Sequence, residues 1–158
     1  RRDCEAFLRE GDRFVDCALA EREGNARFRV DGSNSALDER SGTETVRVST
    51  LAREYALRPP RADALLKIDV QGADLRVVEG GAELVRRHVA VVIIEVSLIP
   101  LDPGAPGPLQ ALARMDELGF RLYDICIFWR RPVDHALWQA DFCCVRKDSP
   151  YGAAGLGY

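Results

Sequence analysis

The sequence predicts an α/β fold in which helices flank a mostly parallel sheet and the chain ends in an antiparallel hairpin. Strand-like and helix-like hydrophobic periods alternate through the middle of the chain. The apolar run VAVVIIEVSL at residues 89–98 is typical of a strand that is covered on both faces. Two further strand-like segments, with a polar stretch between them, follow the last predicted helix. Because the chain has 158 residues and is 47% hydrophobic, we expect one domain with one core.

The first part of the chain predicts short strands and one helical turn. Strands are predicted at residues 13–20 (RFVDCALA), 26–30 (ARFRV) and 46–48. A helical turn is predicted at residues 49–55, where the hydroxyl of Ser49 or Thr50 can cap its N-terminus, and Pro59 and Pro60 end the element. The polar segment GSNSALDERSG at residues 32–42 is expected to be a loop, either a lid or a disordered connection.

The second part alternates strand and helix more regularly. An apolar strand at residues 64–70 precedes a helix at 73–87, in which Leu75, Val78, Ala82 and Val85 recur at helical spacing. The remaining predicted elements are the strand at 89–98, a Pro/Gly-rich loop at 100–108, an amphipathic helix at 109–118, strands at 120–129 and 140–145, and a tail at 148–158.

Composition excludes several classes of function. A net charge of -3 provides no basic surface for nucleic acid or for an anionic membrane. The longest apolar run, residues 89–94, is far shorter than the roughly 20 residues that a membrane-spanning helix needs. The five cysteines are an odd number, and none forms a C-x-x-C pair or lies near a histidine at metal-ligand spacing. We therefore expect a soluble, cytoplasmic protein with free thiols and no metal site.

Two charged residues stand in the predicted strand at 64–70. Lys67 and Asp69 interrupt an apolar run, and Gly72 opens the turn into the next helix. Ligands of open α/β sheets bind beyond the carboxyl ends of the strands, and neighbouring parallel strands bring Asp69 and Glu95 to one rim. A partly desolvated carboxylate there has a raised pKa and is suited to accept a proton. The alternative is structural: Asp69 caps the following helix, and Glu95 pairs with Lys67 or an arginine.

The same stretch, LLKIDVQGADLRVVEGG at residues 65–81, resembles the signature K-I-D-x-E-G-x-E of the FkbM-type methyltransferases. Lys67, Ile68, Asp69 and Gly72 match that signature, whereas Gln71 and Asp74 stand where the family more often has Glu. Three further stretches agree in order and spacing: VDCALAEREGNARFRV at 15–30, VVIIEVS at 91–97, and LGFRLYDI at 118–125 followed by WQADFCCV at 138–145. The resemblance covers residues 14–147.

The resemblance implies a Rossmann-like enzyme that transfers a methyl group from S-adenosylmethionine, usually to a hydroxyl oxygen of a small molecule or sugar. It implies that Asp69 is the base or orienting residue at the reacting groups, that Glu95 is the second candidate, and that Lys67 keeps one of these carboxylates ionised. The expected partner is therefore a small-molecule or sugar acceptor, with neither nucleic acid nor membrane as a partner.

The resemblance also assigns binding residues. Cys17 and Ala18 would approach the adenine of the cofactor, which needs an apolar wall and backbone partners. Gln139 and Asp141 match a Q-x-D pair of the family and would contact the acceptor, or else hydrogen-bond within the hairpin. His135, in the polar stretch RRPVDHALW, is a further candidate for acceptor contact, although a solvated loop histidine is the alternative.

The chain departs from the family pattern at its start. Family members begin with a strand, a glycine-rich turn, and a second strand that ends in an acidic residue for the ribose, and RRDCEAFLREGDR at residues 1–13 has none of these. We therefore expect residues 1–158 to be a single, N-terminally truncated methyltransferase domain that lacks the first two strands. Two other readings stay open: a non-catalytic remnant or interaction module of the same fold, and a Rossmann-like enzyme of another class.

Overall fold

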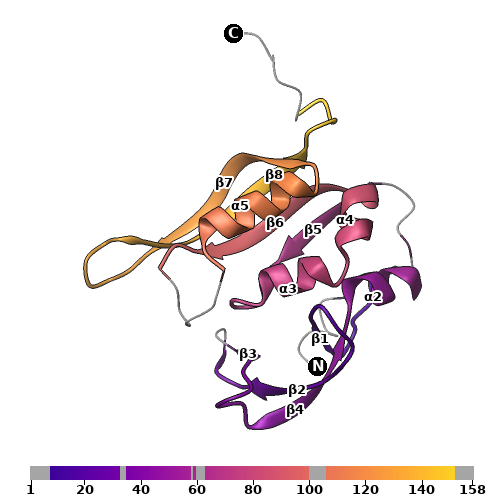
Figure 1. The fold of residues 1–158 in the computed structure, drawn as a ribbon. Helices are drawn as coiled ribbons and strands as arrows, with labels where there is room; N and C mark the ends of the chain where they lie inside the picture. The colour runs from indigo at the N-terminus through magenta and orange to yellow at the C-terminus, as the bar shows by residue number, and fades with distance from the viewer. Residues whose placement is uncertain (1–7, 33–34, 58, 60–62, 100–105, 152–158) are drawn as a thin grey trace.

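The computed structural model describes residues 8–32, 35–57, 59, 63–99 and 106–151. Its fold is mixed α/β, with two four-stranded sheets (Figure 1). The pattern of strands in the sequence did not indicate that they divide into two sheets. The Rossmann-like strand order with two missing strands stays a prediction. Among the described residues, no helix is both long enough and apolar enough to cross a membrane.

The N-terminal sheet has the strand order β1-β4-β2-β3. Its strands are β1 (Ala18–Leu19), β2 (Gly24–Arg29), β3 (Ala36–Leu37) and β4 (Glu44–Ser49). β1 pairs with β4 in parallel, and β2 pairs with β3 and β4 in antiparallel. The predicted strand at 13–20 is therefore much shorter than expected, and the predicted loop at 32–42 contains β3 because residues 36–37 pair with 28–29 of β2.

The C-terminal sheet has the strand order β5-β6-β8-β7. Its strands are β5 (Ala64–Ile68), β6 (Val89–Ser97), β7 (Phe120–Arg130) and β8 (Leu137–Arg146). β5 and β6 are parallel, so their carboxyl ends meet at one rim as predicted. β8 is antiparallel to both β6 and β7, which confirms the predicted hairpin.

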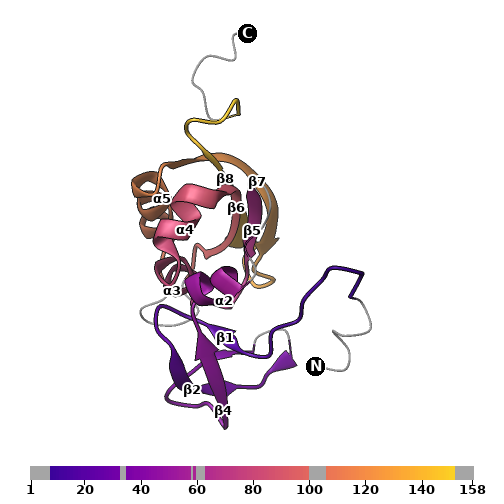
Figure 2. The same cartoon turned by 90° about the vertical axis from the view of Figure 1, so that its right-hand side faces the viewer.

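Three helices cover one face of the C-terminal sheet: α3 (Asp74–Glu79), α4 (Ala82–His88) and α5 (Pro108–Glu117) (Figure 2). Side chains alternate along a strand, so Ile68, Ile94 and Phe142 point into the core beneath these helices. Val78 and Met115 close that core from the helix side, and both are almost fully buried. Lys67, the residue before Ile68, therefore lies on the opposite face of the sheet.

The predicted helix at 73–87 is wrong as one element, because it breaks between α3 and α4. A Cβ atom on Gly80 would lie 2.2 Å from the carbonyl oxygen of Ala20, so any larger residue would require the backbone to shift. The backbone N–H of Ala52 donates to the carbonyl of Gly80 at 3.0 Å. The break thus lets the end of β1 and helix α2 (Leu51–Leu57) pack against the C-terminal sheet's helices. The predicted cap of that helix is confirmed, since Thr50 Oγ1 accepts the N–H of Arg53 at 3.2 Å.

β7 is exposed along nearly its whole length. Only Phe120 is buried among its eleven residues. Its exposed apolar side chains are Leu122, Tyr123, Ile125, Ile127, Phe128 and Trp129. In the described part of the chain, β7 and β5 are the two edges of the C-terminal sheet.

Candidate functional site

A cluster of five polar side chains lies at the carboxyl ends of β5 and β6 and on the facing part of β8. We call it the rim cluster; its members are Lys67, Asp69, Gln71, Glu95 and Asp141. Lys67 Nζ lies 2.8 Å from Asp141 Oδ2 and 3.4 Å from Asp69 Oδ2. Gln71 Nε2 donates to Asp69 Oδ1 at 3.1 Å and to Glu95 Oε2 at 3.2 Å. One ammonium and one amide therefore link three carboxyl groups.

The turn after β5 places Gln71 in this position. Gln71 has φ 53° and Gly72 has φ 93°, so two successive residues adopt left-handed backbone conformations. Such a conformation costs little at glycine but is strained at glutamine. Asp74 holds the turn, since its carboxylate accepts the backbone N–H of Gly72 at 3.1 Å and that of Val70 at 3.4 Å. The strained residue at this turn is thus the one whose side chain bridges Asp69 and Glu95.

Burial and neighbouring charges shift the protonation of Glu95. Glu95 is only 8% exposed, and this burial raises its pKa to about 7. The negative charges of Asp69, Asp74 and Asp141 add to the upward shift. The charge of Lys67 opposes this shift but does not cancel it. A carboxyl group that titrates near neutral pH can accept a proton and release it again.

The pKa of Lys67 is shifted by opposing effects. Burial lowers it, but the hydrogen bond and charge of Asp141, together with the charge of Asp69, give a net upward shift. The lysine therefore stays charged and holds both of these carboxylates. Its ion-pair partners are Asp69 and Asp141, so the alternative in which Glu95 pairs with Lys67 is wrong.

The structure also bears on the alternative role of Asp69. Helix α3 begins after Ala73 and has no side-chain cap, so Asp69 does not cap it. Its carboxylate binds Lys67 and Gln71 instead. Gln71 and Asp74 are the two members of this region that sequence reasoning missed as site residues. The signal for Asp74 was its place two residues after Gly72, where its carboxylate accepts backbone N–H groups of the turn. The Gln71 side chain bonds two carboxyl groups instead, so this signal does not apply to it.

Two polar side-chain atoms on β8 are buried without a hydrogen-bond partner in the described part of the chain: Gln139 Nε2 and Asp141 Oδ1. Gln139 stands opposite Ser97 on β6 and opposite Trp129 on β7. Buried polar atoms are normally paired, so each unpaired one requires an explanation. The predicted pair Gln139 and Asp141 thus offers one free donor and one free acceptor.

His135 is not part of this cluster. It lies in the loop of the β7–β8 hairpin with φ 58°, and its side chain is exposed. Its backbone N–H donates to Arg131 O at 2.8 Å, and its carbonyl accepts from Arg130 Nη1 at 2.9 Å. Because Asp141 follows Leu137 by four residues of extended strand, about 13 Å along β8 separates the loop from the cluster. The contacts of His135 therefore close the hairpin loop.

A cavity of about 290 Å³ connects the two sheets beside the rim cluster. Cys17 and Ala18 line it from the N-terminal sheet, and Asp69, Val70 and Ala73 line it from the turn after β5. Its remaining lining residues are Leu19, Phe28, Ser35, Ala36 and Leu37. The structure thus brings the predicted cofactor residues Cys17 and Ala18 to the same cavity as Asp69. A second cavity of about 480 Å³ shares Cys17, Ala18 and Phe28 with the first and also includes Val46.

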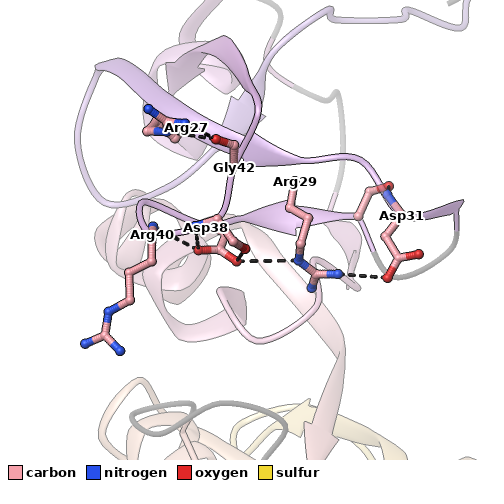
Figure 3. A network of polar contacts seen from close by, with 8 residues as sticks. Arg27, Arg29, Asp31, Asp38, Arg40 and Gly42 are labelled. Carbon is pink, nitrogen blue, oxygen red and sulfur yellow. Dashed lines mark hydrogen bonds and ion pairs between the residues drawn. The ribbon is translucent and has the colours of Figure 1, made fainter.

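A polar network fixes the wall of the smaller cavity that β3 provides (Figure 3). Asp38 accepts the backbone N–H of Arg40 at 3.0 Å, and Arg29 Nε lies 3.5 Å from Asp38 Oδ2. Arg27 Nε donates to the carbonyl of Gly42 at 2.8 Å. These contacts hold the connection between β3 and β4 against β2, and so they keep residues 35–37 at the cavity.

The cysteines and acidic groups show no metal chemistry in the part of the chain that the structure describes. Cys17, Cys126, Cys143 and Cys144 are free thiols there. Burial raises the pKa of Cys17, so its thiol is neutral and suits an apolar wall. No group of three or more metal-binding side chains occurs among residues 8–151 outside the gaps named above.

The chain was compared with models of known protein families. A family model described as the methyltransferase FkbM domain matches residues 7–122, which is more than half of the chain. The chain belongs to the FkbM methyltransferase family. No curated protein and no solved structure matches it. The matched part of the FkbM domain contains Cys17, Ala18, Lys67, Asp69 and Glu95, whereas β8 with Gln139 and Asp141 lies beyond it.

Proposed function

We propose that this FkbM domain binds S-adenosylmethionine and methylates a hydroxyl oxygen of a small molecule or sugar. The observation that carries the proposal is the 290 Å³ cavity, because it joins Cys17 and Ala18 to Asp69 at the edge of the rim cluster. A cofactor wall and a candidate proton acceptor thus share one space. The rim cluster lies at the carboxyl ends of parallel strands, where ligands of α/β folds bind.

The lining of this cavity fits the adenine part of the cofactor. Ala18, Phe28, Leu37 and Val70 provide apolar surface, as expected for a site that holds a flat heteroaromatic ring. The neutral thiol of Cys17 adds to that surface. When bound, S-adenosylmethionine supplies an electrophilic methyl group on a sulfonium ion.

The rim cluster supplies the groups that O-methylation needs from the protein. Methyl transfer to a hydroxyl depends on alignment of the acceptor and on removal of its proton. Asp69 and Glu95 are the candidate proton acceptors, and Lys67 forms an ion pair with Asp69. The unpaired donor of Gln139 can orient a hydroxyl group, whose oxygen accepts a hydrogen bond.

The test is calorimetric titration of the chain with S-adenosylhomocysteine, the product form that cannot react. We expect saturable binding that Leu37→Trp weakens at least tenfold, because the larger ring fills the 290 Å³ cavity. Val46→Trp is the matched control, since Val46 is also half-buried but lines only the larger cavity. Absence of binding by a folded chain contradicts the proposal. An equal loss of affinity in Leu37→Trp and Val46→Trp also contradicts it.

A second candidate function, a non-catalytic interaction module, is favoured by the exposed apolar side chains of β7. Tyr123 is 54% exposed and Phe128 is 56% exposed, and both lie on an edge strand. Exposed apolar surface on an edge strand favours association with another chain. A folded chain that self-associates through β7 but binds no S-adenosylhomocysteine would favour this candidate over the enzyme.

A further inference from the structure

Glu95 and Asp141 are direct cross-strand neighbours. They are Cα partners in the antiparallel pairing of β6 with β8. Ile94 and Phe142, their neighbours in sequence, belong to the core beneath the helices, so both carboxyl groups point to the opposite face. Residues paired in this way have Cβ atoms about 4.5–5.5 Å apart, which puts the carboxyl groups within reach of each other. Glu95 is 8% exposed and Asp141 is 2% exposed, so water does little to separate their charges.

One of the four carboxyl oxygens of this pair, on Asp141, is buried without a hydrogen-bond donor from the residues that the structure describes. Asp141 Oδ2 accepts from Lys67, and Glu95 Oε2 accepts from Gln71. Asp141 Oδ1 is buried and has no donor among the described residues. Two like charges directly opposite each other are unfavourable, and an unpaired buried oxygen adds a further cost. A single proton on Glu95 would neutralise one of the two charges and would provide a hydrogen-bond donor for the unpaired oxygen of Asp141.

We propose that the neutral carboxyl of Glu95 donates a hydrogen bond to Oδ1 of Asp141, so that the two carboxyl groups hold one proton between them. The charged groups around Glu95 are Lys67 and Asp69 from β5 and its turn, Asp74 from α3, and Asp141 from β8. Three of these four are negative, which favours the protonated form. The raised pKa of Glu95, about 7, agrees with this arrangement.

This pairing identifies the general base of the reaction, and this step rests on the proposed function. Above neutral pH Glu95 is ionised, and the proton that leaves the acceptor hydroxyl moves to its carboxylate. That proton is then held against Asp141 Oδ1. Asp69 is the less suitable base, because its side chain is 43% exposed and already binds the Lys67 ammonium. Glu95 is therefore the base, and Asp141 is the residue that positions the transferred proton.

The test uses the chain without cofactor, so its failure is distinct from failure of cofactor binding. Infrared difference spectra across neutral pH, combined with ¹³C NMR titration of labelled glutamate carboxyls, report the protonated form of Glu95. We expect a carboxylic C=O band below pH 7 that is absent in Glu95→Gln. Asp141→Asn should shift this band to higher frequency, because a neutral oxygen is a weaker acceptor, and should lower the pH of titration.

Asp69→Asn is the matched control. It removes a neighbouring negative charge, so it should also lower the pH of titration, but it should leave the frequency of the C=O band unchanged. A band that Asp141→Asn does not move, or the absence of a carboxylic band in the wild type, overturns the proposal.

The variant Glu95→Gln allows the proposal to be tested even if Asp141→Asn fails to fold. Glu95→Gln keeps a donor at the same place, so its side-chain amide protons should be shifted downfield and protected from solvent exchange. Amide protons with the shifts and exchange of a free glutamine overturn the proposal. If the shared proton is observed but S-adenosylhomocysteine does not bind, only the proposed function fails.

Discussion

Lys67 Nζ lies 2.8 Å from Asp141 Oδ2, so a side chain of β5 reaches across β6 to an acidic group on β8. The two residues are 74 positions apart in the sequence. Lys67 is partly exposed, whereas the Asp141 side chain is 3% exposed. The ion pair therefore compensates a buried charge, which is a different role from that of the ion pairs on the surface of the chain.

Replacement of Lys67 should reveal that role. We expect Lys67→Met to lower the free energy of unfolding by about 1–3 kcal/mol, because it leaves the buried Asp141 carboxylate without its cation. We do not expect a loss at the upper end of the range that is usual when a buried ion pair is broken, because the Lys67 side chain is partly exposed to water. Lys147→Met is the control: its partner Asp116 has a side chain that is 71% exposed, and we expect a change below about 0.5 kcal/mol. Urea denaturation measures both; equal effects would contradict a special role for Lys67.

The double variant Lys67→Met with Asp141→Asn tests the cause. Once Asp141 is neutral, no buried charge needs compensation, so we expect the double variant to regain about half or more of the stability lost in Lys67→Met. The same urea denaturation gives the coupling energy of the pair. Strictly additive losses would show that Lys67 stabilises the sheet through packing of its methylene groups.

Glu95→Gln should change how stability depends on pH. The folded-state pKa of about 7 lies above the ordinary value of 4.5, so the folded state binds more protons between these values. The stability that neutral Glu95 provides is therefore complete below about pH 4.5 and is lost as pH rises through about 7. Relative to wild type, Glu95→Gln should gain about 3 kcal/mol on going from pH 4.5 to pH 8. Thermal unfolding at a series of pH values measures this, and parallel profiles for the two proteins would refute it.

Gly80→Ala should destabilise the junction between the two sheets. The added Cβ would lie 2.2 Å from the Ala20 carbonyl oxygen, so the backbone must move, and we expect a loss of about 1–3 kcal/mol. Gly107→Ala is the control, since nothing lies within 4 Å of a Cβ there and its φ is -82°. We expect the control to change stability by less than about 1 kcal/mol. Hydrogen exchange should place the loss at β1 and α3; a stable Gly80→Ala protein would show that this contact is not required.

Gln71 combines a strained backbone with two side-chain hydrogen bonds, and two variants separate them. Gln71→Ala loses the bonds to Asp69 and Glu95 and keeps the strain at φ 53°, whereas Gln71→Gly loses the bonds and relieves the strain. We expect Gln71→Gly to be more stable than Gln71→Ala by about 1 kcal/mol. Thermal unfolding measures the difference. If the alanine variant is the more stable, residue 71 does not keep this conformation in solution.

The local elements of the C-terminal sheet were predictable from sequence, since each depends on residues close together in the chain. The apolar runs predicted β5 and β6, and their parallel order placed Asp69 and Glu95 at one rim. The helix at 73–87 was predicted as one element because its hydrophobic period continues through Gly80. The break falls at Gly80 and Gly81: Gly81 leaves the helical conformation with φ -152°, and a Cβ on Gly80 would meet the Ala20 carbonyl oxygen. Hydrophobic periodicity carries no information about that distant contact.

The sequence by itself determined the alternation of strands and helices, the FkbM family and the identity of the acidic residues at the rim. Tertiary structure decided which of these residues touch. Strand order brought Lys67 to Asp141 across β6, register set Glu95 opposite Asp141, and a left-handed turn aimed Gln71 at two carboxylates. The physical reason is that side-chain period fixes the face on which a residue lies, whereas pairing between strands far apart in the chain fixes its neighbours. The pKa of Glu95 depends on those neighbours, so it too was decided by the folded structure.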